Sequence, residues 1–252
     1  MIVYCATYYV LGILGVNLGY HRMLAHRAVR LPKWLARFCV LLGLPAGTPV
    51  QWVGNHRFHH AHADTAIDSH SPCRDGFWYA HCGWYHGWRS APICVCFALA
   101  GPLRLLIDAW LQPSSGNCHN TLAADITADA FLSRLSQPWT YCLLLHLHAA
   151  LALAIPFAYW GSNGLLLAWG TWVAVYNLGD AINSLTHDRT GPVNRRWLAF
   201  LTAGEGWHAN HHRHPGSPRH GVAGGQLDIT WQIIRLLALA GWATVENKHG
   251  SA

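Results

Sequence analysis

Residues 138–182 read PWTYCLLLHLHAALALAIPFAYWGSNGLLLAWGTWVAVYNLGDAI and carry one charged side chain, Asp180. Two apolar segments, 138–160 and 164–182, are separated only by the small uncharged residues Gly161, Ser162 and Asn163. An α-helix rises about 1.5 Å per residue, so each segment crosses, or nearly crosses, a hydrocarbon layer about 30 Å thick. The stretch predicts a hairpin of two membrane-spanning helices.

The N-terminal segment 2–20 carries no charge and comes close to the same length, so it predicts a third spanning helix. The composition agrees, because 52% of the residues are hydrophobic, only 11% are charged and 14 are Trp. Such a chain is too apolar for a typical soluble domain. We expect a single all-α domain built as an integral membrane helical bundle.

Basic residues indicate how this bundle is oriented. They follow the first helix, precede the hairpin and follow it: Arg22, Arg27, Arg30, Lys33, Arg37, Arg134, Arg189, Arg195 and Arg196. Because cytosolic flanks carry an excess of Lys and Arg, residues 21–137 and 183–252 are expected to form a helical cap in the cytosol, below the inner membrane in a bacterium. The weaker apolar stretches 34–53 and 91–111 are expected in the interface. If only one of them crossed the bilayer, the later histidines would lie on the opposite side.

The overall charge and the cysteines exclude several classes of protein. The net charge of +6 is dispersed over several flanks, which favours anionic lipid headgroups and not nucleic acid as the partner. The eight Cys form no C-x-x-C pair, so neither a disulfide framework nor a zinc ribbon is indicated. The 19 His outnumber the 11 acidic residues, which points to metal chemistry.

The most informative pattern is a histidine triad at positions i, i+3 and i+4, which occurs twice. The first triad is His56, His59 and His60, and the second is His208, His211 and His212. On a helix this spacing places three imidazoles on one face. Chance would supply on the order of a tenth of one such triad in this chain, so both triads predict metal ligands.

Two further pairs lie where predicted spanning helices reach the cytosol. His21 and His26 are five residues apart after the spanning segment 2–20, and Asn183 and His187 are one turn apart at the end of the spanning segment 164–182. A polar residue in a spanning segment is costly unless it has a function. The two pairs bring the number of imidazoles at this membrane face to nine, enough for two ions. Imidazole binds iron, zinc, copper and nickel, so the ligands alone leave the metal open.

The other histidines have simpler interpretations. Five are expected to be ordinary surface residues: His70, His119, His214, His220 and His249. His146 and His148 lie inside a predicted spanning helix and are expected to form hydrogen bonds within the bundle. Four carboxylates near the clusters are candidate acceptors for the second ring nitrogen of a ligand: Asp64, Asp68, Asp188 and Glu205.

Three strings carry a resemblance to a known family: HRMLAH (21–26), HRFHH (56–60) and GEGWHANHH (204–212), with NSLTH (183–187) between the last two. They resemble the three histidine boxes and the accessory ligand segment of the membrane fatty acyl desaturases, in the Δ9 acyl-CoA or acyl-lipid branch. The likeness runs from about Tyr8 to Leu239 and includes HADTAIDSHSP, GFWYAHCGW, SPRHG and QLDITWQIIRLL.

This resemblance implies two iron ions held by the nine histidines, with Asn183 linked through water and no catalytic residue separate from the ligands. It also implies dioxygen as co-substrate, an acyl tunnel past the metals, and a ferredoxin or b-type cytochrome as electron donor. Tyr8 and Tyr9 are candidates to close the far end of that tunnel. We expect the family's first spanning helix to be missing from this sequence. The sequence also departs from the family in the short loop after His187 and in placing Asp180 where an apolar or aromatic residue is expected.

Two alternatives remain open at this level. An acyl hydroxylase on the same scaffold also begins by abstracting hydrogen from a methylene. A membrane transporter or sensor would use the histidines to bind zinc, although a transporter should place its ligands near the bilayer midplane.

Overall fold

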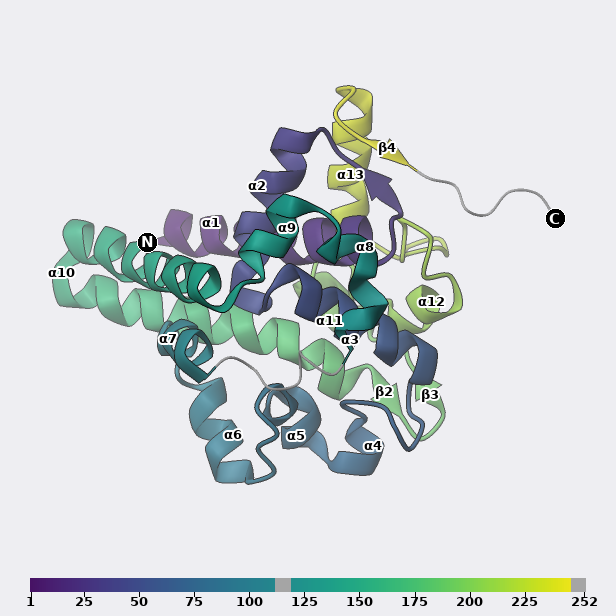
Figure 1. Ribbon diagram of the computed structural model, residues 1–252, viewed down its shortest axis with the longest axis horizontal. Helices are drawn as coiled ribbons and strands as arrows, with labels where there is room; N and C mark the ends of the chain where they lie inside the picture. The colour runs from purple at the N-terminus through teal and green to yellow at the C-terminus, as the bar shows by residue number, and fades with distance from the viewer. Residues whose placement is uncertain (112–118, 246–252) are drawn as a thin grey trace.

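Two long apolar helical stretches organise the fold (Figure 1). The computed structural model describes residues 1–111 and 119–245. Helix α1 (Ile2–Gly12) continues directly into the π-helix η1 (Ile13–Ala25), and α10 (Pro138–Leu185) runs out and doubles back. Within the described residues, Ile2–Ala25 and Pro138–Leu185 are the two stretches long and apolar enough to cross a membrane.

The reversal of α10 depends on two glycines. Gly161 has a φ of 58°, in the left-handed region that glycine enters without a Cβ penalty. At Gly164 a Cβ atom would lie 2.0 Å from the carbonyl oxygen of Pro156, so a larger residue would force the two arms apart. The turn therefore falls in the small uncharged link between the two apolar segments.

The other helices are short, and they pack along α10 and around the end of the molecule remote from its turn. They are α2 (Lys33–Gly43), η2 (Leu44–Ala46), α3 (Pro49–His62), α4 (Pro72–Asp75), α5 (Phe77–His81), η3 (Gly83–Tyr85), α6 (Ala91–Ala98), α7 (Leu103–Leu111), η5 (Asn120–Ala123), α8 (Ala124–Thr127), α9 (Ala130–Leu135), α11 (Arg196–Leu201), α12 (His208–Arg213) and α13 (Ile229–Leu239). Four two-residue strands form two antiparallel pairs, β1 (Val29–Arg30) with β4 (Thr244–Val245) and β2 (His187–Asp188) with β3 (Gly191–Pro192).

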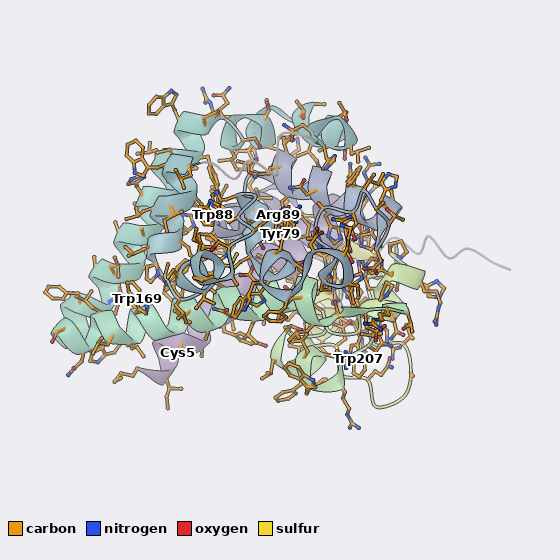
Figure 2. All side chains as sticks on the ribbon, turned by 90° about the horizontal axis from the view of Figure 1, so that it is seen from below. Cys5, Tyr79, Trp88, Arg89, Trp169 and Trp207 are labelled. Carbon is orange, nitrogen blue, oxygen red and sulfur yellow. The ribbon has the colours of Figure 1, made fainter. Side chains whose placement is uncertain are left out.

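The core lies between η1, α2, α3 and the arms of α10. The Tyr4 hydroxyl donates to the Ala152 carbonyl oxygen at 2.8 Å and fixes α1 against the first arm. Buried apolar residues such as Tyr20, Leu44 and Leu145 continue the contact inward. Figure 2 shows Cys5 and Trp169 at the end where α10 projects and Trp207 at the other end, where the histidine-bearing segments meet.

Candidate metal centre

Five imidazoles from three helices form a first group. His21 and His26 come from η1 and its end, His56 and His60 from α3, and His211 from α12. Their ligand atoms all lie within 4.8 Å of one another. Nε2 of His211 is 2.9 Å from Nε2 of His21 and 2.8 Å from Nε2 of His60, and the Nε2 atoms of His26 and His56 are 2.8 Å apart.

Four more imidazoles form a second group beside the first: His59, His187, His208 and His212. Nε2 of His208 lies 3.0 Å from Nε2 of His187 and 3.0 Å from Nε2 of His212. The rings of His60 and His212 stack with centroids 4.2 Å apart, so the two groups are neighbours. Together they contain all nine histidines that the sequence predicted as ligands.

These short nitrogen–nitrogen distances suit a metal better than hydrogen bonds. A neutral imidazole nitrogen has either one proton or one lone pair, so Nε2 of His211 cannot form ordinary hydrogen bonds with two other such nitrogens. Two nitrogens that bind one ion at about 2.1 Å and at a right angle lie roughly 3.0 Å apart. The donor set therefore fits two ions that accept neutral imidazole.

Each triad contributes to both groups. On α3, His56 and His60 belong to the first group and His59 to the second, while on α12 His211 belongs to the first and His208 and His212 to the second. One helical face is wide enough to present ligands to two adjacent centres. A capping box at Thr48 and Gln51 fixes the start of α3 and thus the direction in which these side chains point.

The π-helix explains the five-residue spacing of His21 and His26. In η1 the amide of His26 donates to the carbonyl of His21 at 3.1 Å, the i to i−5 bond of a π-helix. This winding brings residues five apart onto one face, and the two rings lie 4.9 Å apart. π-Helices are rare and are frequent at functional sites.

Carboxylates hold the second ring nitrogen of three of the ligands. Nδ1 of His21 lies 2.7 Å from Glu205, Nδ1 of His59 is 3.0 Å from Asp68, and Nδ1 of His187 is 2.7 Å from Asp64. A carboxylate on Nδ1 keeps the proton there and leaves the Nε2 lone pair for a metal. Three of the four candidate carboxylates thus contact a ligand, whereas Asp188 accepts from the amide of Thr190.

Burial favours the neutral form of six of these imidazoles, because it lowers the pKa of His26, His56, His60, His208, His211 and His212. Burial, with the neighbouring imidazoles, holds the pKa values of His56, His208 and His211 well below the usual range. Burial and the nearby His59 lower the pKa of His212 to about 2. Neutral rings offer lone pairs at neutral pH, as metal binding requires.

The prediction that His70 and His220 lie at the surface is wrong. His70 and His220 are buried, with 6% and 1% of their surfaces exposed. His70 stacks on His59 with ring centroids 4.3 Å apart, and Nδ1 of His220 lies 3.3 Å from the Arg22 guanidinium. The only sequence signal for them was their place in the strings HADTAIDSHSP and SPRHG, because neither repeats a ligand spacing.

The remaining histidines considered in the sequence lie outside the two groups. His119 and His214 are half-buried, and His249 lies outside the described residues. His146 and His148 each approach the carbonyl oxygen four residues earlier at 2.8 Å, so their hydrogen bonds lie within one helix and do not cross the bundle.

A cavity of about 270 Å³ adjoins both histidine groups. His21 and His56 of the first group and His59 and His208 of the second line it. Asn183 also lines it. Tyr8 and Tyr9 lie in its wall, where Tyr8 packs on Trp172 and the Tyr9 hydroxyl donates to the Leu201 carbonyl at 2.9 Å.

The family model for fatty acid desaturases matches residues 1–223, which contain both histidine groups. The chain belongs to the fatty acid desaturase family. It is accordingly an oxygen-dependent fatty acyl desaturase, an oxidoreductase of lipid metabolism.

Curated members of the family align over most of this desaturase. An acyl-CoA 5-desaturase of Anemone leveillei is 35% identical over 94% of the chain and 68% of its own length. An sn-1 stearoyl-lipid 9-desaturase of Anabaena variabilis is 34% identical over 94% of the chain and 80% of its own length. A Delta-9 acyl-lipid desaturase of Arabidopsis thaliana is 33% identical over 94% of the chain and 72% of its own length. The relatives thus include enzymes named for either acyl carrier.

Proposed function

We propose that this desaturase introduces a cis double bond at the Δ9 position of a saturated acyl chain carried on CoA or on a lipid. The observation that carries the proposal is that nine imidazoles lie in two adjacent groups and that members of both groups line one cavity. Relatives named for acyl-CoA and for acyl-lipid substrates support both carriers, and two of them are named for Δ9 chemistry.

The residues present fit two iron ions. One ion would be held by His21, His26, His56, His60 and His211, and the other by His59, His187, His208 and His212 with Asn183 through water. When bound, the irons supply the oxidising power that breaks unactivated C–H bonds with dioxygen, which no side chain can provide. Two C–H bonds break and a C=C bond forms, while O₂ takes up those two hydrogens, two electrons and two protons to give two waters.

The protein's own part is to position the groups. Glu205, Asp68 and Asp64 keep the proton on Nδ1 of their histidines and orient the rings. The cavity holds a flexible chain so that one pair of adjacent methylenes faces the ligands, which lowers the entropy cost of reaction. Tyr8 and Tyr9, in the wall of the same cavity, would limit how far the chain extends.

The enzyme would be an integral membrane protein of a single domain, with its histidines facing the cytosol. Residues 2–20, 138–160 and 164–182 would span the bilayer, 34–53 and 91–111 would lie in the interface, and 21–137 and 183–252 would form the cap. Large apolar side chains on the outside of α10 support this placement, since Trp139, Leu143 and Leu166 are more than two thirds exposed. The electron donor would be a ferredoxin or a b-type cytochrome.

Expression in a host that lacks its own desaturase tests the proposal. Fatty acids extracted from the cells are profiled by mass spectrometry, and a product two hydrogens lighter than the saturated acid is expected at C9. A product one oxygen heavier would identify a hydroxylase instead. Protein purified with zinc and without iron, and inactive with dioxygen and reductant, would favour a metal-binding or transport role.

A further inference from the structure

A buried ion pair lies in the wall of the cavity. Nη1 of Arg104, on α7, is 2.7 Å from Asp180 on the second arm of α10, and the two side chains are 3% and 4% exposed. The other oxygen of Asp180 accepts from the Tyr85 hydroxyl at 2.9 Å. Both charged residues line the cavity together with Asn183 and His59. Asp180 is the position where an apolar or aromatic residue was expected.

Burying this ion pair is energetically unfavourable. Two charges removed from water lose several kcal/mol of hydration each, and well-packed apolar residues of similar size are often no less stable. The guanidinium of Arg104 lies 4.0 Å from the centre of the Tyr176 ring and 4.2 Å from that of Phe97, so it is enclosed by aromatic rings. An ionisable residue in a spanning helix indicates a functional site by default.

Two hydrogen-bond donors near the pair lack a partner. Nε of Arg104 and the hydroxyl of Tyr141 are buried and have no partner within residues 1–111 and 119–245. Both residues line the cavity. Most buried polar groups in folded proteins are paired, so two unpaired donors beside one cavity need an explanation.

The two carboxylates nearby are already engaged. The carboxylate of Asp180 accepts from Arg104 and Tyr85, and that of Asp108 lies 2.9 Å from Nε2 of His86. A methylene chain offers no lone pair and would leave the two donors unpaired. An oxygen atom carried on the chain, as a hydroxyl or a carbonyl, has two lone pairs with which to accept from them.

We propose that the cavity section formed by Arg104, Tyr141 and Asp180 recognises an oxygen substituent on the acyl chain, so that the enzyme selects hydroxy- or oxo-acyl substrates. The inference rests on the proposed function and specifies its substrate class. A site built to pair a substrate hydroxyl rejects the analogue that lacks it, because the buried groups are then left unpaired.

The position of the pair also locates the oxygen. Asp180 precedes Asn183 by three residues on α10, a rise of about 4.5 Å along the helix. The substituent should therefore lie close to the bond that is desaturated and not at the far end of the chain. Among acyl chains that carry the oxygen at successive carbon atoms, the enzyme should prefer one position or two neighbouring positions.

The test feeds yeast that lacks its own Δ9 desaturase and expresses this enzyme. The cells receive stearic acid together with hydroxystearic acids that carry the hydroxyl at successive positions, and they attach each to CoA and lipid themselves. Mass spectrometry gives the ratio of desaturated hydroxy product to desaturated plain product. We expect one isomer to be preferred by at least about tenfold, the effect of leaving one buried donor unpaired.

Variants separate recognition from a structural role. Tyr141→Phe removes only a hydroxyl and should lower the preference for the hydroxy isomer severalfold. Replacing the pair with apolar residues, Arg104→Met with Asp180→Leu, should abolish or reverse it. Tyr159→Phe is the matched control, because Tyr159 lies on α10 but is 76% exposed, and its ratio should equal that of the wild type. A purely structural role would reduce both products equally.

Equal use of stearic acid and every hydroxy isomer by the wild type would overturn the inference, as would a preference that neither the Tyr141 variant nor the double variant changes. Either result leaves the desaturase assignment intact. Absence of any desaturated product from correctly inserted wild-type enzyme would overturn the proposed function, and with it this inference.

Discussion

His211 shows at the scale of one residue why the site suits a metal. Its Nε2 atom has two other imidazole nitrogens within 3 Å, its ring is 1% exposed, and its pKa is held far below the usual range by burial. A histidine at the surface does not combine these three features. A buried, neutral imidazole such as His211 can therefore offer a metal a lone pair without adding charge.

Single ligand substitutions should remove iron from one group at a time. His211→Ala acts on the first group and His59→Ala on the second, and each should lower the iron content by about one ion and abolish product while the protein remains in the membrane. Elemental analysis of purified protein measures the loss. His119→Ala is the control, since His119 stacks on Phe58 outside both groups. An unchanged iron content in both ligand variants would contradict the assignment.

The Glu205 carboxylate should tune metal affinity without binding metal. Glu205→Gln removes the charge that orients His21, and loss of such a partner typically weakens metal binding about 10- to 100-fold. Competition with a chelator of known affinity measures the change. Asp188→Asn tests a carboxylate that contacts Thr190 instead, and its affinity should not change. Equal effects of the two substitutions would refute the role of Glu205.

At the scale of elements, the predicted ligands come from three kinds of secondary structure: a π-helix, two α-helices and a short strand. The π-helix η1 supplies residues five apart, α3 and α12 supply residues three and four apart, and His187 follows the end of α10 in β2. Periodicity predicted which histidines share a helical face. It could not predict that each triad divides between two groups, because that depends on where neighbouring elements lie.

Other features of the site were beyond sequence reasoning for physical reasons. The π-helical winding of η1 has no simple residue signature, so the His21 and His26 spacing seemed irregular. His70 and His220 are buried by contacts with residues distant in sequence. Asp180 was noted as unusual, but its partner Arg104 is 76 residues away in sequence and is brought to it only by the packing of α7 on α10.

The α10 turn gives a prediction at this scale. Gly164→Ala should destabilise the hairpin, since the new Cβ atom would meet the Pro156 carbonyl oxygen at 2.0 Å. Gly170→Ala, on the same arm and with nothing within 4 Å, should be neutral or stabilise by up to about 1 kcal/mol. Thermal unfolding in detergent compares them. A Gly164 variant as stable as the Gly170 variant would show that the arms are not packed in this way.

At the scale of the whole molecule, the α10 hairpin projects from one end, and α3, α12 and β2, which carry the predicted ligands, lie toward the other (Figure 1). The hairpin end exposes large apolar residues such as Tyr159 and Leu166, and the opposite end carries the short helices and strands. This division agrees with the proposed placement, in which the hairpin lies in lipid and the histidine groups face the cytosol.

Protease accessibility tests that orientation. A cleavage site inserted at Ser162, in the hairpin turn, should be cut only from outside the cell, whereas one inserted at Thr190, after β2, should be cut only in inside-out vesicles. Cleavage of both sites from the same side would contradict the proposed topology.

The central claim is that two irons occupy the two histidine groups. Anomalous difference maps recorded at the iron absorption edge, from crystals of enzyme purified with its metals, test it most directly. The account predicts two peaks, one among His21, His26, His56, His60 and His211 and the other among His59, His187, His208 and His212. A single peak, or none at the iron edge with occupancy at the zinc edge, would contradict it.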